Sequence, residues 1–476
     1  MKLVRPTLPL MIQTTVLVVL LVLAACQRVA EDDAADAISD AKIIKDTATT
    51  VDITKPDVAP DAKADIAKDV AAPPEQCGND LDDDGDGYID EANCYPGPNL
   101  RVGSEWLDLG VVAIGVGKEK AGMRTFGAAL KNEGMVVTAE DVMVRPVGTY
   151  PQYVWAEQLI SPSGVVDLAA GEWQTSPNRG QVGEAASTLQ VGMSPTISVI
   201  AGPWKVAFTH AAQIASSWDG QTTAAKLHLG VYARPEIAAN QIAYFDLDVF
   251  CVGGVPMPCA QLATSPQWQI MADRINAIWK TASIQLGTVT FTDLDGDDGT
   301  KYKYIDNVLE GQPQNELFGV YQATAKKRPQ STAATLVLVA GLNDNGLGVA
   351  AGLSALGGVP GWPGRRTSGL AVAIDPDKWQ IVVDEGPDVS YAGDVWGVVI
   401  AHEIGHFLGL WHTDEKAGGQ HDTVDDTPPC NLDESIEKTK ETCPVQAKYL
   451  MFWAPAATSL TLGQAKVARL SPALRP

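Results

Sequence analysis

The stretch that decides the fold runs from residue 402 to residue 412 and reads His-Glu-Ile-Gly-His-Phe-Leu-Gly-Leu-Trp-His. His402 and His406 are four residues apart, so on a helix both imidazoles project from the same face. Gly409 allows the helix to end and the chain to turn sharply. His412 can then supply a third nitrogen from outside the helix. Three histidine ligands leave a fourth position for water, so the stretch predicts a catalytic zinc site.

Glu403 lies beside the first of these histidines, on the flank of the same helical face. From there its carboxylate can reach a water molecule on the zinc, whose pKa the metal lowers to about 7, without becoming a ligand. The carboxylate can take a proton from the water and later pass it to a leaving amine. Three of the chain's six histidines occupy this motif. The pattern therefore predicts hydrolysis with Glu403 as the general base.

The extended motif resembles that of the metzincin metalloproteases, and most closely that of the pappalysin-like family. The further matching pieces are residues 422–428, the cysteines 430 and 443, the segment Tyr449–Trp453 with Met451, and a helix start at 462–464. The resemblance covers about residues 260–470. It implies an α/β (α+β) metzincin-like catalytic domain, a zinc-dependent endopeptidase activity on proteins or peptides, and a Met-turn at Met451 beneath the zinc. An ordinary core methionine is the alternative for Met451.

The same resemblance implies a calcium ion near the zinc. In that family the Asp-rich loop after the third histidine holds structural calcium, which assigns the role of ligands to Asp422, Asp426 and Thr427. A polar loop without an ion is the alternative. One position departs from the pattern: many metzincins have a tyrosine two residues after the methionine, where this chain has Trp453. An indole can donate through its N–H, but it cannot ionise as a phenol does.

The strand nearest the cleft is also implied by the resemblance. Residues 370–374, Leu-Ala-Val-Ala-Ile, are expected to form the upper edge strand, and an extended substrate would add alongside it. The active-site helix is expected to begin near Asp394, a good N-cap, and to run through Leu408.

The N-terminus predicts export. Residues 1–25 combine basic residues with an apolar run and end in Leu-Ala-Ala before Cys26, which resembles a bacterial lipobox. We expect a lipoprotein signal peptide over 1–25, lipid on Cys26, and an anchor to the bacterial outer membrane or cell surface. A plain signal peptide is the alternative. Residues 26–76 lack aromatic side chains and any sustained apolar period, so they predict a disordered acidic tether.

Six cysteines remain of the seven once Cys26 is set aside, and they fall into sequence-local pairs. Six cysteines allow 15 connectivities. Local pairing is the simplest and suits an oxidising compartment, which gives Cys77–Cys94, Cys251–Cys259 and Cys430–Cys443. A free cysteine on the zinc, silencing the enzyme, is the alternative for the second pair.

Residues 77–98 form a small module closed by the first of these pairs. Asp82, Asp84 and Asp86 stand at alternate positions, a glycine follows, and Asp90 comes next. Hard oxygen ligands at positions 1, 3 and 5 followed by a glycine are the front half of a calcium loop. The module is therefore expected to bind Ca²⁺. A solvated acidic loop is the alternative.

Two larger regions follow. Residues 99–235 consist of strand-length apolar runs separated by turn residues, which predicts an antiparallel β-sandwich-like domain. Its role stays open between a binding module, a pro-domain and a spacer. Residues 236–476 alternate helical and strand-like apolar spacing, which predicts an α/β catalytic domain.

The charge narrows the function classes. The formal net charge of −23 argues against nucleic-acid binding, which needs a basic face. The expected partners are a protein or peptide substrate, and a membrane only through the N-terminal lipid. A non-catalytic surface adhesin that retains an idle zinc site is the competing hypothesis. Glu403 argues against it, because an idle site has no use for a general base.

Overall fold

The computed structural model describes residues 95–476 except 115–123, 129–133, 143–151, 168–181, 185, 195–196, 213–224, 307–315, 344–351, 375–388, 416–420, 433–437 and 455–456. The predictions for the signal peptide and Cys26, the tether, the Cys77–Cys94 pair and the calcium-loop aspartates (Asp82, Asp84, Asp86 and Asp90) lie outside the described residues. No helix in the described ranges is both long and apolar enough to cross a bilayer.

The first half of the described chain is built from two antiparallel sheets. One has the strand order β1(Glu105–Ile114)-β9(Ala225–Arg234)-β3(Gly134–Asp141)-β7(Ala186–Gln190). The other has the order β2(Arg124–Ala128)-β8(Gly202–Ala212)-β4(Gln152–Ser161)-β5(Gly164–Asp167), and β6(Val182–Glu184) pairs with β4. Val137 and Leu229 of the first sheet share one buried core with Trp204 and Phe208 of the second. That this region is a separate sandwich domain stays a prediction.

The second half is built around a mixed sheet with the order β11(Ile284–Leu294)-β10(Ala243–Val252)-β13(Ala334–Val339)-β16(Gly369–Ala373)-β15(Gly352–Ser354). The first four strands are mutually parallel, whereas β15 runs antiparallel to β16 and β17(Leu474–Arg475) runs antiparallel to β10. A small parallel pair joins β12(Tyr304–Ile305) to β14(Gly341–Leu342). The prediction of mixed α/β structure for this half is confirmed.

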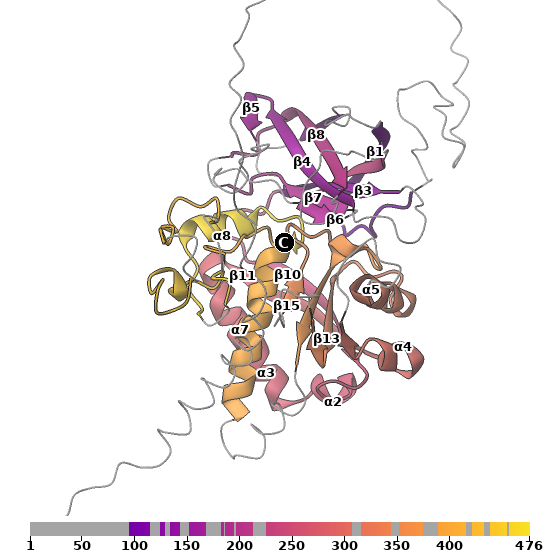
Figure 1. The fold of residues 1–476 in the computed structure, drawn as a ribbon, viewed down its shortest axis with the longest axis vertical. Helices are drawn as coiled ribbons and strands as arrows, with labels where there is room; N and C mark the ends of the chain where they lie inside the picture. The colour runs from indigo at the N-terminus through magenta and orange to yellow at the C-terminus, as the bar shows by residue number, and fades with distance from the viewer. Residues whose placement is uncertain are drawn as a thin grey trace, which may run out of the picture. The chain divides into compact units, whose positions relative to one another are not determined.

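Helices cover both faces of this sheet (Figure 1). They are α2(Cys259–Leu262), α3(Pro266–Trp279), α4(Gly296–Lys301), α5(Glu316–Lys327), α7(Val389–Phe407) and α8(Leu462–Arg469), with 3-10 turns at Lys280–Ala282, Arg366–Ser368 and Gln446–Lys448. Successive strand residues point to opposite faces. Leu247 and Val249 of β10 accordingly pack with α3 and α7, whereas Phe250 and Val252 pack with α5.

Local sequence explains where two of these helices begin. The Ser265 hydroxyl accepts the N–H of Trp268 and a proline opens α3, which is a favourable N-terminus. Thr461 and Gln464 form a capping box at the start of α8. Helix α7 differs from expectation, because it begins at Val389 and ends at Phe407. The potential cap at Asp394 thus lies inside the helix, where backbone hydrogen bonding continues past it.

The edge-strand prediction was wrong. Leu370–Ile374 corresponds to β16, which lies between β13 and β15 and is therefore internal. Among the described residues the outer strand is β15, and its residues Gly352, Leu353 and Ser354 pair with Val372, Ala371 and Leu370. Three residues are too few to show a strand period in the sequence.

Two of the three expected disulfides lie in the described part of the chain, and both form. Cys251 pairs with Cys259 and Cys430 pairs with Cys443, with Cα–Cα distances of 5.4 Å and 5.8 Å. Because Cys251 and Cys259 are bonded to each other, neither is the free thiol that silencing of the zinc would need.

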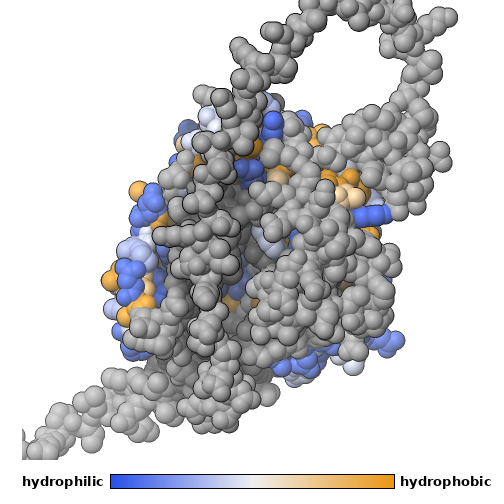
Figure 2. All heavy atoms as spheres, turned by 45° about the horizontal axis from the view of Figure 1, so that its top comes forward, coloured by the Kyte–Doolittle hydropathy of each residue, from blue (hydrophilic) through white to orange (hydrophobic). Residues whose placement is uncertain are grey.

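Hydrophobic side chains are mostly inside, but a few remain on the surface. Among the residues whose exposure the structure describes, the large exposed ones are Leu100, Val102, Leu107, Ile242, Tyr304, Val445 and Leu462. In the face drawn in Figure 2, the residues that carry a hydropathy colour mix hydrophilic blue with smaller hydrophobic orange areas. Isolated exposed apolar residues of this kind are normal for a folded protein.

Candidate metal centre

The C-terminal end of α7 brings the three motif histidines together. His402 and His406 lie on one face of this helix, and Gly409 ends it with a φ of +93°. The N–H of Gly409 donates to the carbonyl of His406 at 2.8 Å, and the N–H of Leu410 donates to the carbonyl of Gly405 at 2.9 Å. These two bonds form a Schellman motif. The chain reverses there, so His412 returns toward the helix as predicted.

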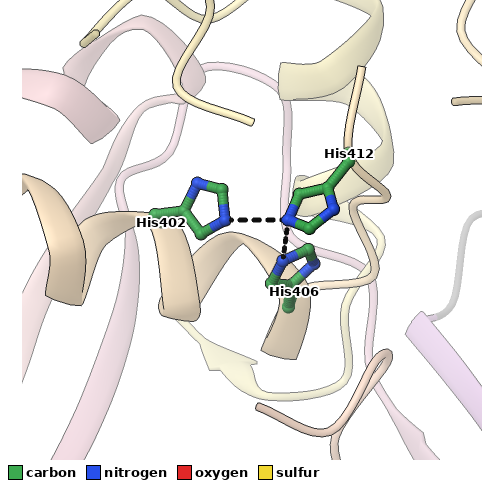
Figure 3. Close-up of side chains that lie close together, drawn as sticks. All are labelled: His402, His406 and His412. Atoms are coloured by element: carbon green, nitrogen blue, oxygen red, sulfur yellow. Dashed lines mark hydrogen bonds between the residues drawn. The ribbon is translucent and has the colours of Figure 1, made fainter. Parts of the chain in front are cut away.

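The Nε2 atoms of the three histidines converge (Figure 3). The Nε2 atom of His412 lies 3.2 Å from that of His402 and 3.1 Å from that of His406. Each ring places its Nδ1 against an oxygen: the carbonyl of Leu450 at 2.7 Å, the carbonyl of Leu410 at 2.8 Å and a carboxylate oxygen of Glu415 at 2.9 Å, for residues 402, 406 and 412 respectively. These oxygens accept hydrogen bonds, so each Nδ1 carries a proton.

A proton on Nδ1 of a neutral imidazole leaves a lone pair on Nε2, so neighbouring Nε2 atoms have no proton to share. Their lone pairs point at a common centre, which is the arrangement that a cation stabilises. Tetrahedral zinc with Zn–N bonds of about 2.0–2.1 Å separates its ligand atoms by about 3.3 Å. The observed separations of 3.1 Å and 3.2 Å are close to this value. The three side chains therefore fit zinc.

Burial keeps the two helical histidines in the form that binds metals. Burial lowers the pKa of His406 to about 3, with His412 adding a smaller repulsive contribution. It also lowers the pKa of His402 well below its ordinary value, and the two neighbouring histidines act in the same direction. A lowered pKa means that the imidazole stays neutral at pH 7, and neutral imidazole is the ligand form.

Glu403 lies in the same buried environment, with 4% of its surface exposed. Burial raises the pKa of its carboxyl to about 8. The side chain lies directly against the backbone of β15, because a Cβ added at Gly352 would collide with the carboxylate and Cγ of Glu403. Only a glycine leaves room for the carboxylate between β15 and α7. Gly352 could not be predicted from the sequence, because it lies about fifty residues from Glu403 along the chain.

Met451 packs against α7, and its assignment to a Met-turn stays a prediction. It is fully buried, and a Cβ added at Gly405 would collide with its sulfur, so the side chain packs directly against α7 between the two helical histidines. The carbonyl of Leu450 accepts the Nδ1 proton of His402, and the carbonyl of Met451 accepts the N–H of Thr413 at 2.7 Å. This segment therefore packs against the helix, orients His402 and holds Thr413, the residue after His412.

The indole N–H of Trp453 has a backbone partner outside the histidine cluster. Its indole N–H donates to the carbonyl of Lys438 at 2.5 Å, and its ring packs with Phe452 beside the Cys430–Cys443 disulfide. The ammonium of Lys438 lies 3.0 Å from a carboxylate oxygen of Asp414, and both side chains are buried. The chain just after His412 is thereby tied to the disulfide loop.

The predicted calcium ligands after the third histidine have protein partners. Asp422 accepts hydrogen bonds from the N–H of Val424, from the hydroxyl of Thr427 and from the side-chain amide of Gln464. Asp426 accepts the N–H of Gly463 at 2.9 Å. These bonds fasten the loop to the N-terminus of α8, where carboxylates are favourable. Nothing in this geometry requires a calcium ion at the loop, and calcium binding there stays a prediction.

Only two groups of His, Cys, Asp and Glu in the described ranges bring three potential ligand atoms within 4.8 Å of one another. One is the histidine cluster. The other is Cys251, Cys259 and Asp293. Two residues beside the histidine cluster could not be predicted from the sequence. They are Glu415, which orients His412, and Gly352. No local pattern marks either of them.

Comparisons with known proteins agree with a peptidase site. The model of a peptidase family described as pregnancy-associated plasma protein-A matches residues 390–474, a segment that contains the three histidines, Met451 and α8. No curated protein sequence matches the chain. The match and the histidine cluster together support a zinc-dependent peptidase.

Two solved structures are similar to part of the chain. Metalloproteinase-II from Bacteroides fragilis has 14% identity and a TM-score of 0.24, over 42% of this chain and 60% of that one. A zinc-dependent peptidase from Methanocorpusculum labreanum has 15% identity and a TM-score of 0.23, over 37% of this chain and 87% of that one. The chain thus spans less than two thirds of the first of these proteins.

Proposed function

We propose that the chain is a metzincin-type zinc endopeptidase in which Glu403 is the general base. The observation that carries the proposal is the convergence of three imidazole Nε2 atoms, each oriented by an acceptor on its Nδ1, beside a buried carboxylate on the same helix. A carboxylate in that position has no role in holding the metal. It is placed for proton transfer.

His402, His406 and His412 would hold the zinc ion. Bound there, zinc would polarise the scissile carbonyl and make a water molecule acidic enough to attack it near neutral pH. Glu403 takes the proton of the attacking water on its carboxylate. The protonated side chain then delivers this proton to the leaving nitrogen.

The substrate is proposed to bind along β15. This strand is the last of its sheet among the described residues, and it lies against Glu403 through Gly352. An extended peptide that pairs with the outer edge of β15 would pass beside the base and the histidine cluster. Backbone pairing of this kind gives affinity with little dependence on side chains, so we propose proteins and peptides as the substrate class.

Export with a lipid anchor on Cys26 remains a proposal from the sequence. Metabolic labelling with a radioactive fatty acid tests it. Label is expected on the wild-type protein and not on Cys26→Ser, and an unlabelled wild-type protein would contradict it.

Cleavage of a denatured protein substrate by the zinc-loaded protein and by Glu403→Gln tests the proposed activity. The change keeps the shape of the side chain and removes its basicity. We expect cleavage to fall by about 10²–10⁴-fold, the usual contribution of general acid–base catalysis, with the zinc content unchanged. Equal cleavage by the two proteins, or no cleavage by the zinc-loaded wild type on a broad set of substrates, would contradict the proposal.

A further inference from the structure

Strand β7 is buried although it is the last strand of its sheet among the described residues. It lies at the end of the order β1-β9-β3-β7, yet all its residues, Ala186–Gln190, are buried. End strands present unpaired backbone groups and need a cover. Here side chains of β7 bond to the catalytic half of the chain: the hydroxyl of Thr188 donates to the carbonyl of Leu356, and the side-chain amide of Gln190 donates to the carbonyl of Val467 at 2.9 Å.

The loop that Thr188 holds closes the end of the zinc-site helix. The N–H of Gly357 donates to the carbonyl of His406 at 2.9 Å, and the N–H of Gly358 donates to the carbonyl of Phe407 at 2.9 Å. These carbonyls belong to the last turn of α7, where helix carbonyls lack a partner within the helix. The hydroxyl of Thr188 thus contacts the loop that caps the helix carrying His402 and His406.

Gln190 acts on the turn that leads to the third ligand. A Cβ added at Gly409 would lie 2.5 Å from the side-chain oxygen of Gln190, so the amide group fills the space beside this glycine. Two residues later, the ring of Trp411 packs against the hydrophobic core that the two β-sheets share. The turn that places His412 therefore rests on the β-rich half of the chain.

The chain beyond His412 is held from the same side. The hydroxyl of Thr423 donates to the carbonyl of Met193 at 3.0 Å, and the hydroxyl of Ser194 donates to the carbonyl of Thr423 at 3.4 Å. All four atoms are in buried residues or their backbone. The turn at Gly409 and the loop at Thr423 lie on either side of His412 in sequence, and one segment, residues 188–194, contacts both.

We infer that residues 186–194 are a permanent part of the metal centre, with Thr188 and Gln190 as positioning residues for His406 and His412. The β-rich region 99–235 is then a support that the mature protein keeps, and not a pro-segment that is removed to activate it. This inference rests on the proposed zinc site, but it does not depend on peptide hydrolysis.

The first test measures zinc affinity by competition with a chromogenic chelator for Thr188→Val and Gln190→Ala. Thr138→Val is the matched control, because Thr138 is equally buried and its hydroxyl donates to the carbonyl of Gly230 within the same sheet at 3.4 Å. Loss of a group that orients metal ligands costs about 10–100-fold in affinity, so we expect about 10-fold weaker zinc binding in both variants. The control is expected to bind as the wild type does. Wild-type affinity in both variants, or an equal loss in the control, would overturn the inference.

The second test cuts the chain between the two halves. A recognition site for a specific protease is inserted between Ala239 and Asn240, which are exposed. After cutting, we expect the two pieces to co-elute in size exclusion and to keep their zinc. Separation of the pieces with zinc retained on residues 240–476 would overturn the inference. An uncut protein that binds no zinc would instead refute the proposed metal site, so the two failures are distinguishable.

Discussion

Two places in the described chain gather three metal-capable groups, and they differ in whether the ligand atoms of those groups remain available to a metal ion. At the histidine cluster, every Nδ1 is occupied by an oxygen acceptor, so every Nε2 lone pair stays free and points inward. At the other cluster, Cys251 and Cys259 are bonded to each other, and Asp293 accepts the N–H of Cys259 at 2.7 Å. Proximity alone does not make a site. Whether a cluster can bind a metal ion depends on the bonding capacity that its atoms still have.

The largest effect is expected when one of the three histidine ligands is removed. In His402→Ala the zinc site keeps two of its three ligands, so we expect the purified protein to lose its zinc. Cleavage should fall by more than the roughly 10²–10⁴-fold that loss of the general base costs, because the metal's contribution disappears as well. Metal analysis after dialysis and a cleavage assay measure both quantities. A variant with full zinc content would show that the ion is held elsewhere.

A smaller effect is expected at Gly352, which touches the base and not the metal. In Gly352→Ala the added methyl group displaces the carboxylate of Glu403. A misplacement of about 1 Å can cost about 10²-fold in rate, so we expect kcat to fall by about that factor while zinc content stays at the wild-type level.

Gly341→Ala is the matched control for that change. It is also a strand glycine, and the nearest atom to its added Cβ is 3.3 Å away on Tyr304. Wild-type kcat in both variants would mean that β15 does not position the base.

We expect the cluster of Cys251, Cys259 and Asp293 to stabilise the fold and not to bind the metal. Replacing both cysteines by serine in Cys251→Ser/Cys259→Ser removes a link that closes an eight-residue separation. Chain entropy predicts a loss of about 2.5 kcal/mol in the free energy of unfolding. Chemical denaturation measures this loss, and zinc content is expected to stay unchanged. Loss of zinc from the double variant would show that the metal binds at this cluster, which we regard as structural.

The smallest effect concerns the loop after the third histidine. Asp426 accepts a hydrogen bond in the first turn of α8, so Asp426→Ala is expected to cost about 0.5–1 kcal/mol of stability. Added Ca²⁺ should leave the melting temperature of the zinc-loaded wild type unchanged. A rise in melting temperature with Ca²⁺ that disappears in the variant would instead support the prediction that this loop binds calcium.

The sequence predicted what depends on short stretches of chain. His402, His406 and Glu403 could be placed because helical periodicity is local, and Gly409 and His412 because a glycine ends the helix at a fixed distance. The two disulfides in the described ranges could be predicted because the two cysteines of each pair are close together in the sequence. The strand pattern of residues 99–235 predicted antiparallel sheets, and the structure has them there.

The rest depends on contacts between distant segments. Strand β15 has three residues and no period of its own, so it could not be recognised as the outer strand. Gly352 and Gln190 matter through what packs against them, and no neighbouring residue indicates this. The Asp-rich loop depends on such contacts as well, because Asp422 and Asp426 accept hydrogen bonds from residues of α8 that lie about forty positions away in the sequence.

Diffraction data collected on either side of the zinc absorption edge, from crystals of the zinc-loaded protein, test the central claim most directly. We predict one anomalous peak about 2.0–2.1 Å from the Nε2 atoms of His402, His406 and His412, with Glu403 outside bonding distance. A peak beside Cys251, Cys259 and Asp293, or a peak ligated by Glu403, would contradict it.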